Sequence, residues 1–281
     1  MQRYVLTLRC ADRPGIVRAL ADGVVAAQGN IVENAQFSDP ATGMFAMRTC
    51  FESPLTEARD VRDAIADAVA GFDAELMVRP EEQRRRALLM VSKFDHCLVD
   101  LLYRWQIGEL PVDIPLVVSN HADLAPLAER YGIPFVHLPV TRETKPDAEG
   151  KLLALIDEHR VDVVVLARYM QVLSDEFCAR LPGRIINIHH SFLPGFKGAK
   201  PYHQAYERGV KIIGATAHYV TGDLDEGPII EQDVVHVGHA QTAEDLVALG
   251  RDVERTVLAR AVRLHAEDRL ALNGSRTIVF R

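Results

Sequence analysis

An asparagine and a histidine two residues apart, Asn187 and His189, stand at the end of the apolar run RIINIHH. In a strand this spacing puts both side chains on one face. Asn187 offers an amide donor, and the ring of His189 can give or take a proton near neutral pH. Such a pair can polarise a carbonyl group and protonate a leaving group. The alternative, that both side chains only cap the strand by bonding to loop backbone, stays open at this point.

A second polar group lies in TGDLDEGPII, between two apolar runs, and includes Asp225. An acidic turn that contains Gly and Pro is commonly just a solvated turn. Next to Asn187 and His189, however, a carboxylate would complete a charge-stabilised acid–base group. His218, in ATAHYV, is a further histidine of the same region and would support that group.

Other chemistries lack their motifs. The sequence has no GxGxxG, GxxxxGK[ST], GxSxG or HExxH pattern. Ser191 follows two histidines, but without the strained turn that a nucleophilic serine needs. The four cysteines are far apart and have no CxxC spacing, which predicts reduced thiols rather than a metal site. We therefore expect neither a metal nor a bound cofactor.

The elements that position these residues are short apolar runs that alternate with helical segments from residue 87 onward. Runs such as VDVVVLA are typical of strands buried on both faces of a parallel sheet. VKIIGATAHYV and PIIEQDVVHV predict two later strands, which could run antiparallel, and a long helix is expected at about 242–265. An open α/β sheet binds its ligand outside the carboxyl ends of its strands. Asn187 and His189 would face that ligand.

Residues 1–80 have a pattern of their own, with four β-rich runs and two amphipathic helices in the order βαββαβ. The charged run EEQRRR at 81–86 predicts a linker. We expect a ferredoxin-like domain at 1–80 and an open, mostly parallel α/β sheet at 87–281. The fold class is α/β, and a length of 281 residues agrees with about two domains.

Composition excludes several partners. A net charge of −7 with no dense basic cluster gives no field that would attract nucleic acid. No run of about 18 apolar residues predicts a membrane span, and the first residues lack the apolar core of a signal peptide. With reduced cysteines, these features predict a cytoplasmic protein.

These residues carry a resemblance to a known family. NIHHSFLPGFKG and LDEGPII resemble the signatures of the folate-dependent formyltransferase fold, and residues 87–281 are similar to glycinamide ribonucleotide transformylase. DRPGIV and GNI resemble an ACT domain, a small ligand-sensing or oligomerising module. An ACT domain followed by this catalytic domain is the arrangement of the formyltetrahydrofolate deformylase family, which the chain resembles over nearly its whole length.

The resemblance implies a hydrolase that acts on a linear amide C–N bond. Water and 10-formyltetrahydrofolate would give tetrahydrofolate and formate, which would supply purine synthesis and balance the one-carbon folate pool. Asn187 and protonated His189 would stabilise charge on the formyl oxygen. Asp225 would hold His189 protonated, orient the water and relay protons to N10, with His218 in support. The pterin ring would bind along Met170, Gln171, Val172 and Leu173.

One departure bears on the acceptor. The transferase has a glycine- and asparagine-rich phosphate loop after its first strand, whereas VSKFDHC stands here, with Asp95 to repel a phosphate and Lys93 to attract an anion. This favours water as the acceptor, and transfer to a small amine remains the alternative. The loop LPGFKG would shape the wall beside His189. His190 would either touch the substrate or pack beneath this loop.

The ACT resemblance implies either an amino-acid effector or oligomerisation alone. An effector would contact Asp12, Gly15, Asn30 and Ile31. In either case we expect a homo-oligomer, a dimer or a tetramer. A non-catalytic regulator that only binds folate is a further alternative, against which the complete set of Asn187, His189 and Asp225 argues.

Overall fold

The structure is a computed structural model of the chain and describes residues 1–195 and 201–281. Contacts within the chain divide it into two compact units. The first unit comprises Met1–Arg84 together with Glu267–Arg281, and the second comprises Arg85–Ala266. Within the described residues, no helix has both the length and the apolar composition needed to cross a bilayer.

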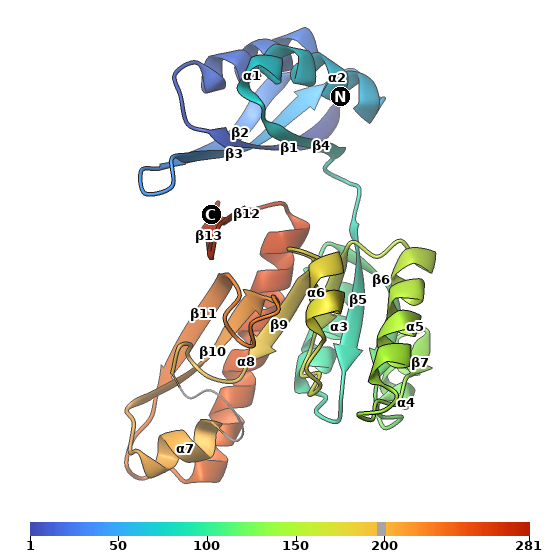
Figure 1. Cartoon of the computed structure of the whole chain (residues 1–281), viewed down its shortest axis with the longest axis vertical. Coiled ribbons are helices and arrows are strands. Elements are labelled where there is room, and N and C mark those ends of the chain that lie inside the picture. The colour runs from blue at the N-terminus through green and yellow to red at the C-terminus, as the bar shows by residue number, and fades with distance from the viewer. Residues whose placement is uncertain (196–200) are drawn as a thin grey trace. The chain divides into compact units, whose positions relative to one another are not determined.

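The first unit contains a four-stranded antiparallel sheet with two helices on one face (Figure 1). Its elements up to residue 80 are β1 (Gln2–Ala11), α1 (Ile16–Ala26), β2 (Asn30–Asp39), β3 (Met44–Ser53), α2 (Ala58–Val69), a 3-10 turn (Ala70–Phe72) and β4 (Glu75–Pro80). The strands lie in the order β2-β3-β1-β4. This confirms the predicted ferredoxin-like βαββαβ arrangement.

The core of the first unit follows from residue spacing. Tyr4, Leu6 and Leu8 occupy every second position of β1 and are buried. Helix α1 contributes Leu20 to the same core, and β3 contributes Phe51, whose ring stacks on that of Tyr4 at 5.6 Å between centroids. Each fully buried Leu or Phe side chain stabilises the fold by about 1.5–3 kcal/mol.

The C-terminal residues join the first unit through a two-stranded hairpin, β12 (Leu270–Asn273) and β13 (Arg276–Val279). Buried arginines of the sheet hold the segment that leads into it. Arg48 donates from Nε to the carbonyl oxygen of Glu267 at 3.0 Å, and Arg79 forms an ion pair with Asp268. The sequence pattern predicted residues 267–281 as part of the second domain. Arg48 and Glu267 are separated by 219 positions in the chain, and Arg79 and Asp268 by 189, so hydrophobic periodicity gave no sign of these pairs.

The second unit is an open α/β sheet of seven strands in the order β11-β10-β9-β8-β5-β6-β7. Its elements are β5 (Arg85–Val91), α3 (His96–Gln106), β6 (Val112–Ser119), α4 (Ala125–Arg130), β7 (Phe135–His137), α5 (Lys145–Glu158), β8 (Val163–Leu166), α6 (Asp175–Arg180), β9 (Ile185–His189), α7 (Pro201–Glu207), β10 (Ile212–Tyr219), β11 (Ile229–His236) and α8 (Ala243–Ala266). Strands β5 to β9 pair in parallel, and β10 and β11 are antiparallel. The predicted mostly parallel sheet is confirmed.

Both faces of this sheet are buried. Leu88 and Met90 of β5 belong to one core cluster with residues of α5 and α6. The alternate residues Leu89 and Val91 point to the other face and are equally buried. Helices α3 and α8 pack together, and α8 also packs along β9, β10 and β11. Double-sided burial explains why the strands appear in the sequence as continuous apolar runs.

Strand β7 is the shortest strand of this sheet among the described residues. Only Phe135–His137 pair with β6. Pro134 and Pro139 flank this segment, and a proline has no backbone N–H to donate to a sheet.

The Arg79–Asp268 pair gives a test of how the C-terminal segment is held. Both side chains are nearly buried, so Asp268→Ala removes the carboxylate that pairs with the Arg79 guanidinium inside the unit. We expect the free energy of unfolding of the first unit to fall by about 3–5 kcal/mol. The matched change Asp22→Ala removes an exposed partner of Arg18 on α1 and should cost less than about 1 kcal/mol. Urea unfolding followed by circular dichroism measures both, and equal stability of the two variants would contradict this account.

Candidate active site

Two facing strands carry Asn187 and His218. Strand β9 pairs antiparallel with β10, and in this register Asn187 lies directly opposite His218. The Nδ2 atom of Asn187 and the Nε2 atom of His218 are 3.2 Å apart. Directly opposed side chains on one sheet face are near enough to bond, so the pairing register alone brings these two groups together.

Asp225 reaches the same place from the loop between β10 and β11. Its backbone has a left-handed φ of 57°, which turns the chain sharply. Two residues later, Gly227 passes so close to β10 that a Cβ atom there would lie 1.7 Å from the carbonyl oxygen of Tyr219. The loop is therefore pressed against the strand that carries His218, and a side chain at 227 would displace it.

The carboxylate of Asp225 lies between two imidazole rings. Its Oδ2 atom is 3.2 Å from Nδ1 of His189, and its Oδ1 atom is 3.7 Å from Nε2 of His218. Burial by itself would raise the pKa of Asp225. The contacts with His189 and then His218 outweigh burial, and they hold the pKa of this carboxyl well below its usual range. Asp225 is therefore ionised at neutral pH.

The two ring nitrogens of His189 have different surroundings. Nδ1 faces Asp225, whereas Nε2 is buried without a hydrogen-bond partner among the described residues. A buried polar atom that lacks a partner is uncommon in a folded protein. The atom at the other end of an anchored imidazole is thus available to a ligand.

His218 has a defined role toward Asn187. Its Nδ1 is 2.9 Å from the backbone carbonyl oxygen of Tyr219, which can only accept, so Nδ1 carries a proton. When the ring is neutral, Nε2 accepts a hydrogen bond from the Asn187 amide; when the ring is charged, the same nitrogen faces Oδ1 of Asp225. This fixes the orientation of the amide and leaves its second N–H for a ligand.

The chain that follows His189 is tied to the neighbouring strands. Thr216 Oγ1 donates to the carbonyl oxygen of Ser191 and accepts from the Leu193 backbone N–H, each at 3.0 Å. Ser191 donates to the carbonyl oxygen of Gly195 at 2.7 Å, which is a structural use of the hydroxyl. The predicted wall-forming loop LPGFKG is described only up to Gly195, and its residues 196–198 lie outside the described residues.

Asn187, His189, His218 and Asp225 all line one cavity of about 650 Å³. The stretch predicted to enclose a pterin lines it too, with Met170, Gln171, Val172 and Leu173. This stretch follows β8, and the Met170 backbone N–H donates to the Ser92 hydroxyl beyond the end of β5 at 2.9 Å. Strands β5 and β8 are the neighbours at which strand order reverses, where open α/β sheets place their ligands.

The chain is similar to known proteins over its whole length. Residues 85–262 match the Formyl transferase family. The chain is 52% identical over 283 residues to the formyltetrahydrofolate deformylase of Corynebacterium sp. (strain P-1), covering 99% of this chain and 98% of the relative. The chain belongs to the formyltetrahydrofolate deformylase family. A crystal structure of a formyltetrahydrofolate deformylase from Burkholderia mallei superposes with a TM-score of 0.96 at 48% identity, over the whole of both chains.

The deformylase family shares its second unit with a transferase. The crystal structure of glycinamide ribonucleotide transformylase 1 from Symbiobacterium toebii matches with a TM-score of 0.66 at 33% identity. That match covers 70% of this chain and 94% of the transformylase. The shared part is thus the formyltransferase-type sheet, and the deformylase family adds further chain to it.

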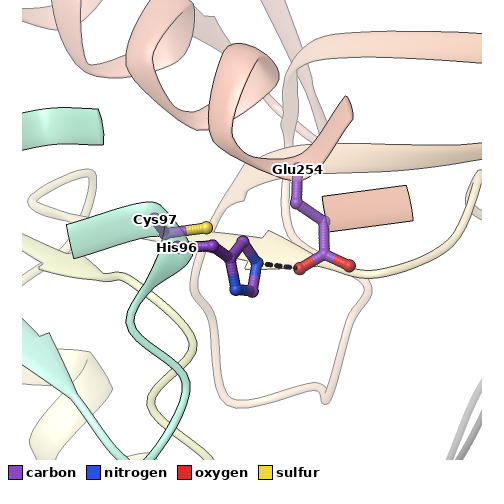
Figure 2. Close-up of side chains that lie close together, drawn as sticks. All are labelled: His96, Cys97 and Glu254. Atoms are coloured by element: carbon purple, nitrogen blue, oxygen red, sulfur yellow. Dashed lines mark hydrogen bonds and ion pairs between the residues drawn. The ribbon is translucent and has the colours of Figure 1, made fainter. Parts of the chain in front are cut away.

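The cavity of this deformylase-family chain contains a second polar cluster that the sequence analysis missed. Its centre is Glu254 of α8, whose side chain is 1% exposed. Its Oε2 atom accepts from Nε2 of His96 at 2.8 Å (Figure 2), and its Oε1 atom accepts from the Tyr202 hydroxyl at 2.8 Å. The guanidinium of Arg168 lies 3.4 Å away. Burial opposes ionisation, but His96 and then Arg168 lower the pKa of Glu254.

Two signals in the sequence point to this cluster. Arg168 follows the apolar run VDVVVLA at the carboxyl end of its strand, as His189 does in its own. Glu254 falls at four-residue spacing with buried Gly250 and Leu258 of α8, so it lies on the buried face of that helix. Gly250 permits the contact with Tyr202, because a Cβ atom there would lie 2.2 Å from the tyrosine ring.

His96, Cys97 and Glu254 place three potential metal ligands within 4.8 Å of one another (Figure 2). Their chemistry favours a hydrogen-bonded network instead. Both oxygens of Glu254 already accept hydrogen bonds, and a guanidinium adjoins them. Burial and then the charge of Glu254 raise the pKa of the Cys97 thiol, which disfavours the thiolate form.

Of the other residues predicted in this unit, His190 lines the cavity, whereas Lys93 and Asp95 do not. His190 lines the cavity, and burial followed by the charge of Arg168 lowers its pKa to about 3, so the ring is neutral. Lys93 and Asp95 are exposed and do not belong to the cavity wall, although their neighbours Phe94 and His96 do. The wall after β5 is therefore aromatic rather than anionic.

The four residues predicted to bind an effector lie on the surface of the first unit. Asp12 and Gly15 belong to the β1–α1 loop, where the Asp12 backbone N–H donates to the Gly43 carbonyl oxygen at 2.8 Å. Gly15 has a φ of 100° immediately before α1. Asn30 and Ile31 begin β2. All four are exposed, and the two pairs belong to separate segments of the unit.

The buried carboxylate predicts a pH dependence. Because the pKa of Asp225 is lower in the folded than in the unfolded chain, its contribution to stability is complete above the unfolded value of about 4 and is lost as pH falls below it. Asp225→Asn should therefore flatten the acid limb of a plot of Tm against pH. The control Asp223→Asn changes an exposed carboxylate of the same loop and should leave the limb as in the parent protein. Identical acid limbs for all three proteins would contradict the assignment.

Proposed function

We propose that this chain hydrolyses 10-formyltetrahydrofolate to tetrahydrofolate and formate. The full-length match to formyltetrahydrofolate deformylases supports the reaction. The observation that carries the proposal is the different surroundings of the two ring nitrogens of His189. One ring nitrogen lies against the Asp225 carboxylate, and the other is buried beside a cavity with no partner among the described residues.

Two donors would act on the formyl oxygen. When water adds to the formyl carbon, negative charge develops on that oxygen. The free N–H of Asn187 and the Nε2–H of a protonated His189 would stabilise it, and Asp225 stabilises the positive charge of that ring. One such donor is typically worth about 3–4 kcal/mol in barrier height. His218 acts through Asn187 by fixing its amide.

Asp225 would also transfer a proton from the attacking water to N10. The attacking water loses a proton as its oxygen bonds to the formyl carbon, and N10 gains one as the bond from that carbon to N10 breaks. A carboxylate held ionised at neutral pH can orient the water and relay this proton. The folate would bind along Met170, Gln171, Val172 and Leu173, with no metal or further cofactor in the reaction.

Water is favoured over an amine as the acceptor by the charge of the cavity. The guanidinium of Arg168 is part of its wall and would repel an ammonium group. The wall next to the end of β5 is formed by Phe94 and His96. The loop at 91–97 contains no asparagine or glutamine that could bind the phosphate of an amine substrate. The formate would feed purine synthesis and balance the one-carbon folate pool.

We further propose that the first unit is an ACT domain and that the enzyme is cytoplasmic. The linker predicted at 81–86 would be shorter, since Arg85 and Arg86 already belong to β5. An amino acid would act at Asp12, Gly15, Asn30 and Ile31.

The exposed apolar residues Val32 and Phe37 on β2 support pairing with a second copy as a dimer or tetramer. Light scattering after gel filtration tests the oligomer, and a rate screen against the common amino acids tests the effector. A monomer or a uniform rate would remove the respective proposal.

The reaction is tested by formate production with water as the only acceptor. Purified protein and 10-formyltetrahydrofolate should give one formate for each tetrahydrofolate formed, because no second substrate is needed. Formate is measured by a coupled dehydrogenase assay and tetrahydrofolate by absorbance. Formate that appears only after an amine is added would show a transferase instead.

Replacement of the carboxylate separates catalysis from binding. Asp225→Asn should lower kcat by about two to four orders of magnitude, since the proton relay and the partner of His189 are both weakened. The Kd for tetrahydrofolate, measured by fluorescence titration, should change only a few-fold. The neighbouring exposed Asp223→Asn serves as the control. Unchanged turnover in Asp225→Asn would refute the catalytic role and favour a folate-binding regulator.

A further inference from the structure

A buried cation lies in the cavity outside the acid–base group. Arg168 follows β8 with a left-handed φ of 65°, and its side chain, 9% exposed, lines the cavity. Its Nε and Nη1 atoms are buried without a hydrogen-bond partner among the described residues. Donors of a guanidinium that remain unpaired inside a protein cost free energy, so this group calls for a further acceptor.

The neighbouring carboxylate does not satisfy it. Glu254 is the ion-pair partner at 3.4 Å, but each of its oxygens already accepts a shorter hydrogen bond, from His96 or Tyr202. A second guanidinium, that of Arg251, lines the same cavity, and both cations lie over the ring of Phe94, at 5.3 Å for Arg168 and 6.0 Å for Arg251. Arg168 is the buried one of these two guanidinium groups, and its Nε and Nη1 atoms stay without a hydrogen-bond acceptor among the described residues.

We infer that Arg168 forms a binding site for the formate product, a small carboxylate, within the cavity where the formyl group reacts. This inference rests on the proposed function. The reaction converts an uncharged formyl amide into an anion inside the cavity, where a buried cation would stabilise it. A planar carboxylate matches the donor geometry of a guanidinium. Because Arg168 shares its cavity with His189 and Asp225, formate is released within the space that this cation lines.

The carboxylates of the folate's own glutamate are the other source of the same chemistry, and kinetics separates the two. Initial rates give Ki for formate and KM for 10-formyltetrahydrofolate. Arg168→Gln should raise Ki for formate at least about tenfold, the usual effect of removing a charge-assisted bond. Arg168→Lys, which keeps the charge but not the paired donors, should raise it less. The control Arg260→Gln removes an exposed guanidinium of α8 that pairs with Asp233, and Ki should not change.

Direct binding is measured without substrate by the line width of ¹³C-formate in the presence of the protein. The parent protein should broaden the signal, and Arg168→Lys should reduce the broadening. No broadening by the parent protein overturns the inference even if Arg168→Gln does not fold. A Ki for formate that is unchanged in Arg168→Lys and Arg168→Gln, with only KM raised, overturns it in favour of the folate carboxylates. A protein that binds formate through Arg168 but releases none from 10-formyltetrahydrofolate retains this site and refutes the proposed function alone.

Discussion

The ionised carboxylate of Asp225 is the constraint on which the arrangement of the site depends. Its position requires a left-handed backbone at residue 225 and a glycine at 227, because the loop runs directly against β10. Both imidazoles are oriented with respect to it, His189 through Nδ1 and His218 through Nε2. A negative charge at half-buried depth is costly by itself and becomes favourable only with these partners. The loop, the two strands and the charge therefore stabilise one another as a set.

The cavity combines two polar clusters, and both present donors that favour negative charge on a ligand. The group of Asn187, His189 and Asp225 presents donors to an oxygen that becomes negative, and the group around Glu254 keeps a cation close by. Helices α3, α7 and α8 supply His96, Tyr202 and Glu254 of the second group, and Arg168 follows β8. The first group comes from β9 and the loop between β10 and β11. The acid–base group and the group around Glu254 thus lie on different elements of one unit, and the packed sheet keeps them at a fixed spacing.

The sequence was sufficient for features that depend on local pattern. Continuous apolar runs predicted the parallel strands, and the rule that ligands lie at the carboxyl ends of strands placed Asn187 and His189 in the ligand crevice. Met170 was predicted from the family resemblance, and it lines the same cavity. Features that depend on distant pairs were not predicted. Glu254 and His96 are 158 positions apart in the sequence, and Arg48 and Glu267 are 219 apart, so hydrophobic periodicity does not reveal either pair. Polar pairs between separate elements require the three-dimensional fold to be identified.

The C-terminal hairpin makes the second unit an insertion within the first, since the chain leaves the first unit after residue 84 and returns to it at residue 267. During synthesis the second unit is therefore complete before the first can be. Arg48 and Arg79 can contact Glu267 and Asp268 only after the whole second unit has been synthesised. A premature stop near the end of the gene would thus spare the sheet that carries the active site and damage the unit made first.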